Sequence, residues 1–158
     1  MTTKLEYGIF DCDTHCYETR DAFTRYLPKE FHDRAIAPVR AADGKEVILA
    51  GHRVATFNSE AGLGFDLAYR PGSLKEMLKQ MGSGNPDETY EPQPMQPEWL
   101  EREPRLKVMA EQNVERAVIF PAGMALAAEH YVDDTEALYA NLRSFNRWFD
   151  DTWGFNYQ

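Results

Sequence analysis

The sequence lacks the features that mark membrane, secreted or nucleic-acid-binding proteins. No stretch approaches the roughly 20 apolar residues of a membrane span, and the first six residues lack the apolar run of a secretory signal. Basic residues are few, because 17 Lys and Arg stand against 26 Asp and Glu, and the net charge is -9. Such a surface repels a polyanion. We therefore expect a cytoplasmic protein with no membrane and no nucleic-acid partner.

Cysteine is also scarce. The chain has two cysteines, Cys12 and Cys16, on either side of His15. This density is far below that of a small secreted domain stabilised by disulfides, and two cysteines with one histidine fall short of the four ligands of a structural zinc site. We expect both cysteines to be reduced and to lie near the end of a buried strand.

Apolar residues are plentiful enough for one folded domain over residues 1–158. The sequence is 43% hydrophobic, 13% aromatic and 27% charged, which is typical of a globular protein with a core. Periodicity and turn signals predict strands and helices in alternation. In chain order we expect a strand at 7–12, a short helix after Thr19 that ends at Pro28, a hairpin at 43–57 with His52 in its turn, helices at 74–81 and 104–114, a strand at 117–120, and a helix at about 133–153 capped by Asp133 or Asp134.

Two helices are predicted to turn an apolar face toward the core. In the first this face comprises Leu74, Met77, Leu78 and Met81, and in the last it comprises Leu138, Leu142, Phe145, Phe149 and Trp153. Arg147 and Trp148 are interpreted as packing residues. Residues 82–97 contain four prolines and two glycines, which predicts an exposed, mobile loop. Residues from about 40 to 100 are therefore interpreted as an insertion that carries the hairpin and this loop.

The order of strand, helix and strand predicts an α/β fold. The run Ala117–Phe120 is continuously apolar and is followed by Pro121, which is typical of a parallel strand buried on both faces. A strand, a helix and a second parallel strand form a right-handed crossover.

The chemistry of the sequence is concentrated at the end of its first predicted strand. Side chains along a strand alternate with a period of two, so Asp11, Asp13 and His15 are expected on one face. Carboxylates with an imidazole are a ligand set suited to Zn, Mn or a similar divalent cation. The pattern D-x-D-x-H is weak by itself, and ordinary polarity at a strand end is the alternative.

Several motifs in a fixed order strengthen the metal hypothesis. They are F-D-C-D-T-H-C-Y-E at 10–18, F-x-x-Y-L-P at 23–28, F-x-D-R-A at 31–35, R-L-K-V-M at 105–109, Q-N-V-E-R-A-V-I-F-P at 112–121 and S-F-N-R-W at 144–148. Together they resemble the amidohydrolase-2 branch of the amidohydrolase superfamily. The resemblance implies the N-terminal part of a (β/α)8 TIM barrel with a divalent metal at the C-terminal mouth. It also implies hydrolysis or decarboxylation of aromatic or enol carboxylic acids.

The resemblance assigns metal ligands residue by residue. The usual first-strand pattern is H-x-H, so Asp13 stands at the first position and His15 at the second. A carboxylate there favours Mn or Mg more than two imidazoles would. The family's other ligands, two histidines and an aspartate, come from later strands. A barrel needs about 250 residues, so those segments are not expected in this chain and its catalytic acid or base is unknown.

Two further residues are candidates for substrate binding. Glu18 lies three residues after His15 and reaches toward the mouth, or else it caps the predicted helix at 21–27. His130 lies after the second predicted strand, on the side where barrel sites form. A solvated loop histidine is the alternative for His130.

Three functional hypotheses follow. In the first, the full-length protein is a metal-dependent enzyme that hydrolyses or decarboxylates a small aromatic or cyclic carboxylate. In the second, the chain is a catalytically inactive truncated fragment with uncovered strand edges, a structural or self-associating piece that forms a homo-oligomer. A small ligand-binding module around the 43–57 hairpin is the third, supported by the hairpin alone.

Overall fold

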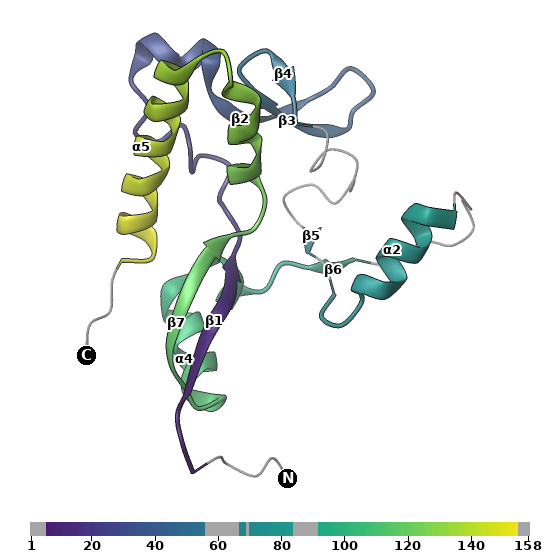
Figure 1. The fold of residues 1–158 in the computed structure, drawn as a ribbon, viewed down its shortest axis with the longest axis vertical. Coiled ribbons are helices and arrows are strands. Elements are labelled where there is room, and N and C mark those ends of the chain that lie inside the picture. Colours follow the sequence, from purple (N-terminus) through teal and green to yellow (C-terminus); the bar gives the residue numbers. More distant parts are fainter. Residues whose placement is uncertain (1–5, 56–66, 69, 84–91, 155–158) are drawn as a thin grey trace.

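The chain forms a parallel pair of strands next to a small helical core. The structure, a computed structural model, describes residues 6–55, 67–68, 70–83 and 92–154 (Figure 1). One part contains the parallel strands β1 (Ile9–Cys16) and β7 (Val114–Pro121), and the other contains α5 (Thr135–Thr152) with an antiparallel sheet. None of the helices in the described part of the chain combines the length and the apolar character of a membrane-spanning segment.

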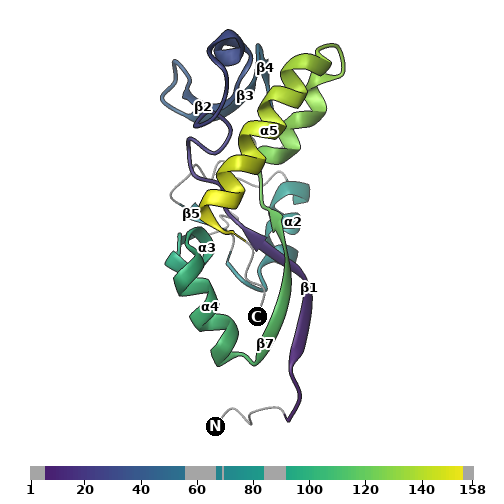
Figure 2. The same ribbon diagram turned by 90° about the vertical axis from the view of Figure 1, so that its left-hand side faces the viewer.

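The parallel pair confirms the predicted order of strand, helix and strand. β1 and β7 pair in parallel from Ile9 with Val114 to Cys16 with Pro121, with shifts of register after Ile9 and between Asp11 and Thr14. The chain reaches β7 through α3 (Pro97–Leu100) and α4 (Arg102–Glu111), and α4 lies along one side of the strands (Figure 2). The C-terminal ends of both strands therefore meet at one edge, and β1 is followed there by the polar residues Glu18 and Thr19.

The expectation that β7 is buried on both faces is wrong. Val118 and Phe120 are 41% and 43% exposed, whereas Ala117 and Ile119 on the alternate face are partly buried. The reason is that α4 packs along one side of the strands, and Val118 and Phe120 project from the exposed side. An apolar face of the pair is consequently open. Cys12 is exposed as well, so only Cys16 meets the expectation of a buried thiol, and both cysteines are free.

The predicted hairpin is present and is larger than expected. β3 (Glu46–Ala50) pairs with β4 (Arg53–Val54), and β2 (Ile36–Arg40) adds an edge strand that the sequence did not predict. The turns at Gly44 and Gly51 have φ of 85° and 60°, which favours glycine. His52 is exposed in the second turn, as predicted. Residues 56–57, the expected end of the hairpin, lie outside the described residues.

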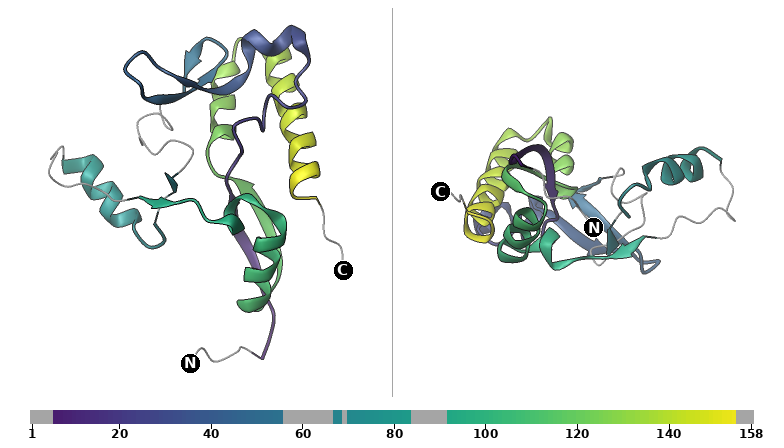
Figure 3. Two further views of the ribbon diagram at one scale, coloured as in Figure 1. Left: turned by 180° about the vertical axis from the view of Figure 1, so that it is seen from behind. Right: turned by 90° about the horizontal axis from the view of Figure 1, so that it is seen from below.

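The helix predicted at 74–81 is α2 (Leu74–Ser83), but it does not turn its leucines to the core. Leu74 and Leu78 are 63% and 55% exposed, and α2 stands apart from the rest of the chain (Figure 3). The side chains of Met77 and Met81 lie outside the described residues. The predicted loop at 82–97 includes the short strand β6 (Gln93–Pro94), which pairs with β5 (Leu67–Ala68), and its residues 84–91 lie outside the described part.

The segment after β1 forms turns where a short helix was expected. Backbone bonds from Ala22 N to Thr19 O and from Arg25 N to Asp21 O, at 3.0 and 2.8 Å, close single turns. The Thr19 hydroxyl donates to the Asp21 carboxylate at 2.6 Å, and this local bond competes with a helix cap. A short 3-10 helix, η1 (Lys29–Arg34), follows Pro28.

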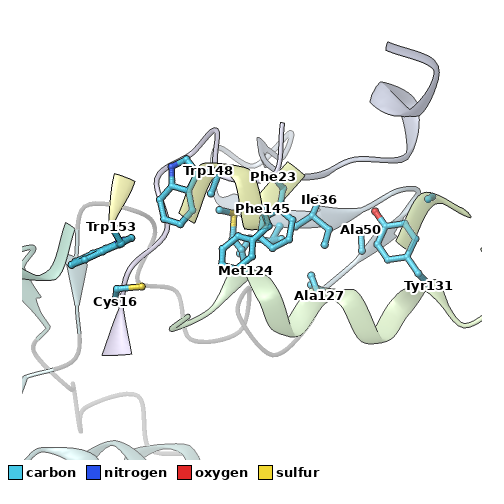
Figure 4. Packing of buried hydrophobic residues seen from close by; sticks show 14 residues of the cluster. Cys16, Phe23, Ile36, Ala50, Met124, Ala127, Tyr131, Phe145, Trp148 and Trp153 are labelled. Carbon is cyan, nitrogen blue, oxygen red and sulfur yellow. The ribbon is translucent and has the colours of Figure 1, made fainter. Parts of the chain in front are cut away.

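The main core lies between α5, the antiparallel sheet and a 3-10 helix, η2 (Met124–Tyr131), where the sequence predicted a loop. Figure 4 shows Met124 of η2, Ile36 of β2 and Phe145 of α5 close together. Asp134 caps α5 as predicted, because its carboxylate accepts the Ala137 N–H at 3.0 Å. Phe145 and Trp153 are buried as predicted.

The centre of the buried face of α5 is shifted from the predicted stripe. Trp148 is fully buried, as its interpretation as a packing residue predicted, and so are the polar residues Asn141 and Ser144. Leu138 and Phe149 lie at the margin of the core. Asn141 is buried because its side chain bonds to backbone: Oδ1 accepts from Ile36 N at 2.8 Å, and Nδ2 donates to Arg34 O at 2.9 Å. The predicted stripe considered only apolar residues of the helix, so it missed a polar residue that is buried because it bonds to a distant backbone segment.

Burial should delay the ionisation of Tyr131. Its hydroxyl donates to Arg34 O at 2.8 Å, and burial raises its pKa from 10 to about 12. Its contribution to stability is therefore complete below pH 10 and is lost as the pH rises through about 12. Absorbance titration should show a late step of tyrosine ionisation in the folded protein. The late step should vanish in Tyr131→Phe, and an unchanged titration curve in that variant would refute the assignment.

Candidate metal centre at the end of the parallel strands

Asp13 and His15 lie together near the C-terminal end of β1. The Oδ1 atom of Asp13 is 3.3 Å from the Nε2 atom of His15, and the two side chains are 86% and 53% exposed. The polar atoms of both side chains are accessible to solvent. The structure thus brings together the two residues that the sequence predicts as metal ligands.

The orientation of the His15 ring suits a ligand role. Its Nδ1 atom lies 3.4 Å from the carbonyl oxygen of Pro121, at the end of β7. A carbonyl oxygen only accepts, so a hydrogen bond there places the proton on Nδ1 and leaves the lone pair on Nε2. A backbone carbonyl behind the ring is a common way to fix the tautomer of a metal-binding histidine.

The separation of the two polar atoms fits a shared cation. Bonds from zinc to oxygen or nitrogen measure about 2.0–2.2 Å, so tetrahedral ligands lie about 3.4 Å from each other. The observed 3.3 Å between Oδ1 and Nε2 is close to that value, and it equally suits an ion pair between the carboxylate and a protonated imidazole. Across the described ranges, however, no group of three or more His, Cys, Asp and Glu side chains is placed to hold a metal. Within the described ranges, Asp13 and His15 therefore fall short of a complete set of metal ligands.

The expectation that Asp11 shares the face of Asp13 and His15 is wrong. The pairing of β1 with β7 is irregular between Asp11 and Thr14, and such an irregularity breaks the alternation of side chains. The Asp11 carboxylate accepts hydrogen bonds from the Thr14 hydroxyl and, at 3.0 Å, from Asp13 N. These two bonds hold the pKa of Asp11 below its usual value. The Asp11 side chain thus stabilises the local backbone conformation of β1 next to Asp13.

Arg105 of α4 connects the end of β1 to the helical connection, a role that its place in the R-L-K-V-M motif did not predict. Its Nη2 donates to His15 O at 2.7 Å and its Nε donates to Glu98 O at 2.6 Å. Burial lowers the pKa of this guanidinium. Next to it, Tyr17 N donates to Trp99 O at 2.9 Å. These contacts fix the backbone on which His15 stands.

Glu18 is buried under η2. Its carboxylate oxygens accept from Gly123 N and Ala125 N, each at 3.2 Å, so it caps η2 and does not cap the segment at 21–27. Burial raises the pKa of Glu18, and the backbone N–H groups partly offset that rise. The carboxylate links the segment after β1 to the loop after β7. Its predicted substrate contact would require access to a group that is only 6% exposed.

Removing the Glu18 carboxylate should loosen this link. Glu18→Ala leaves two backbone donors of the β7–η2 turn without their acceptor, and we expect a loss of about 1–2 kcal/mol in the free energy of unfolding, as for a lost helix cap. Urea denaturation measures it. Because the pKa is raised above 4.5 in the fold, the advantage of Glu18 over the neutral Glu18→Gln should be greatest below pH 4.5 and decline as the pH rises. An advantage that grows with pH would contradict this placement.

His130 lies at the far end of η2 from β7. Its backbone oxygen accepts from Arg53 at 2.9 Å, and the same guanidinium pairs with Asp133 at 2.7 Å. Its ring is near Glu129, with 3.8 Å between Nε2 and Oε1. These contacts attach the hairpin to η2. His130 is accordingly placed beside the hairpin, and no described contact joins it to Asp13 or His15.

The comparisons with known proteins point to one superfamily. No family model matches the chain, and no curated protein matches it. Among solved structures, an amidohydrolase from Mycobacterium avium subsp. paratuberculosis K-10 is similar, with a TM-score of 0.79 and 30% sequence identity. The similarity covers 98% of this chain and 41% of that chain, so this chain spans less than half the length of its structural neighbour. The likeness in both fold and sequence supports a place for the chain in the amidohydrolase superfamily.

Proposed function

We propose that the intact protein is a metal-dependent enzyme of the amidohydrolase-2 branch, and that this chain supplies the N-terminal part of its (β/α)8 barrel. The observation that carries the proposal is the 3.3 Å approach of Asp13 and His15 at the C-terminal end of the first parallel strand. Active sites of such barrels lie at that end of the strands. The similarity to an amidohydrolase over 98% of the chain favours a hydrolase-family function.

Asp13 and His15 would hold a divalent metal such as Zn or Mn. One carboxylate oxygen and one imidazole nitrogen are donors that both ions accept. When bound, the metal would act as a Lewis acid that orients the substrate and stabilises developing negative charge. The chain's own contribution is positional, since Pro121 O directs the His15 lone pair outward and Arg105 holds the His15 backbone.

The proposed substrate is a small aromatic or cyclic carboxylate. Hydrolysis is favoured by the name of the structural neighbour, and decarboxylation is the alternative within the same branch. Both reactions need a group that donates or accepts a proton at the reacting atom. We assign that group to the part of the intact protein beyond these two strand–helix units.

Activity assays on the metal-loaded intact protein test the proposal. We expect hydrolysis of a cyclic lactone or amide, or release of CO2 from an aromatic carboxylate, and we expect His15→Ala and Asp13→Ala to reduce it at least about 100-fold, because each removes a metal ligand. The matched control is His52→Ala, which removes an exposed histidine from the hairpin turn. Full activity in His15→Ala would contradict the proposal. A protein that binds no metal and forms only a stable dimer would instead support the self-associating fragment.

A further inference from the structure

The open face of β7 carries an aromatic ring directly beside the candidate metal ligands. Phe120 is the cross-strand partner of His15, and the two rings lie 6.0 Å apart with 41° between their planes. The next residue, Pro121, supplies the carbonyl oxygen that faces His15 Nδ1. Phe120 is 43% exposed. The same strand end therefore presents a polar pair and an apolar surface next to each other.

The apolar surface continues away from the strand end. Val118 and Phe120 share the face opposite α4 because side chains alternate along a strand, and Phe10 of β1 is 61% exposed. In the proposed barrel these side chains would face the interior, which is packed except at the C-terminal mouth where Phe120 lies. Phe120 is the member of this row that is paired with His15, so it is the one within reach of a ligand held there.

We propose that Phe120 is a specificity-determining residue, an apolar wall against which the ring of the substrate packs while its carboxylate is held at the Asp13–His15 centre. The inference rests on the proposed function and adds the element that selects an aromatic or cyclic acid over a short aliphatic one. The proposed site has a polar part that binds the carboxylate and an apolar part that binds the ring. A charged group needs the polar pair, and a ring gains by leaving water for an aromatic surface.

Fluorine NMR of the Mn²⁺-loaded intact protein tests this division with two probes. Para-fluorobenzoate carries a ring and a carboxylate, and fluoroacetate carries the carboxylate without the ring. Bound Mn²⁺ broadens the fluorine signal of any probe held near it, so both affinities follow from line widths. The variants are Phe120→Ala and Phe120→Leu, and the matched control is Val118→Ala, two residues further from the strand end on the same face.

We expect Phe120→Ala to weaken para-fluorobenzoate about tenfold, with fluoroacetate and Mn²⁺ affinities unchanged. Phe120→Leu should retain part of the preference, and Val118→Ala should retain all of it. Equal affinities of Phe120→Ala and the unmutated protein for para-fluorobenzoate would overturn the inference. So would a fall in the melting temperature or a change of oligomeric state without any selective effect, since Phe120 would then pack against another strand or a second copy.

The failure of this inference is distinct from the failure of the proposed function. An unmutated protein that takes up no Mn²⁺ contradicts the metal centre and the substrate wall together. A protein that binds Mn²⁺ through Asp13 and His15, but prefers para-fluorobenzoate equally with and without the Phe120 ring, contradicts the substrate wall alone.

Discussion

Replacing Trp148 with alanine should lower the free energy of unfolding by about 3–5 kcal/mol, the usual cost of removing a large aromatic side chain from a core. Trp148 is fully buried in α5, and its ring lies 5.5 Å from that of Phe145. Whole domains of this kind are stable by only about 5–15 kcal/mol. The variant should therefore unfold at much lower urea concentrations, and it should approach the limit of folding at physiological temperature.

Two control variants separate packing from other causes. Tyr139→Ala removes an exposed aromatic residue from the same helix and should change stability by less than about 0.5 kcal/mol. Trp148→Phe keeps most of the buried apolar surface and removes an indole N–H that has no hydrogen-bond partner in the described part of the chain. It should therefore lose much less than the alanine variant. Equal losses in Trp148→Ala and Tyr139→Ala would show that α5 does not pack as described.

Asn141→Leu should cost about 2–4 kcal/mol, because it removes hydrogen bonds of about 1 kcal/mol each and leaves a buried donor unpaired. The donor left without an acceptor is the backbone N–H of Ile36, which bonds to Asn141 Oδ1 at 2.8 Å. The lost donor group is Nδ2, which bonds to Arg34 O and Ala137 O, both at 2.9 Å. The side chain is of similar size in both residues, so the change is mainly one of polarity. Urea denaturation measures this loss in the free energy of unfolding.

The matched control for Asn141 is Asn146→Leu on the exposed side of the same helix. It makes the same chemical change without a buried partner, and we expect a change of less than about 0.5 kcal/mol. Hydrogen exchange adds a local measurement, since the amide of Ile36 should lose protection in Asn141→Leu before the rest of the core does. Unchanged protection at Ile36 would contradict the role given to Asn141.

The sequence predicts features that depend on local spacing. The helix α5 and its Asp134 cap, the turns of the hairpin and the strand β7 follow from periodicity and turn chemistry within a few residues. The approach of Asp13 to His15 follows from the same alternation. Asp11 does not follow this alternation, because the pairing of β1 with β7 is irregular before Thr14. β7 lies about 100 residues later in the chain, so the local sequence does not predict this irregularity.

The remaining features depend on contacts between distant residues. Glu18 caps η2 from 105 residues away, and Asn141 bonds to Ile36 across the same number of positions. Their polar side chains look like surface residues until their backbone partners are known. The strand β2 contains Pro38, which weakens any strand signal, yet proline is tolerated there because β2 is an edge strand. The exposure of Val118 and Phe120 depends on which neighbours cover β7.

Metal content after exhaustive dialysis tests the central claim most directly. The account predicts that the intact protein retains about one equivalent of Zn²⁺ or Mn²⁺ per chain, that His15→Ala and Asp13→Ala retain much less, and that His52→Ala retains as much as the unmutated protein. Elemental analysis of the four dialysed proteins, side by side, gives the answer. Equal metal content in His15→Ala and in the unmutated protein, or no metal in either, would contradict a cation site at the end of β1.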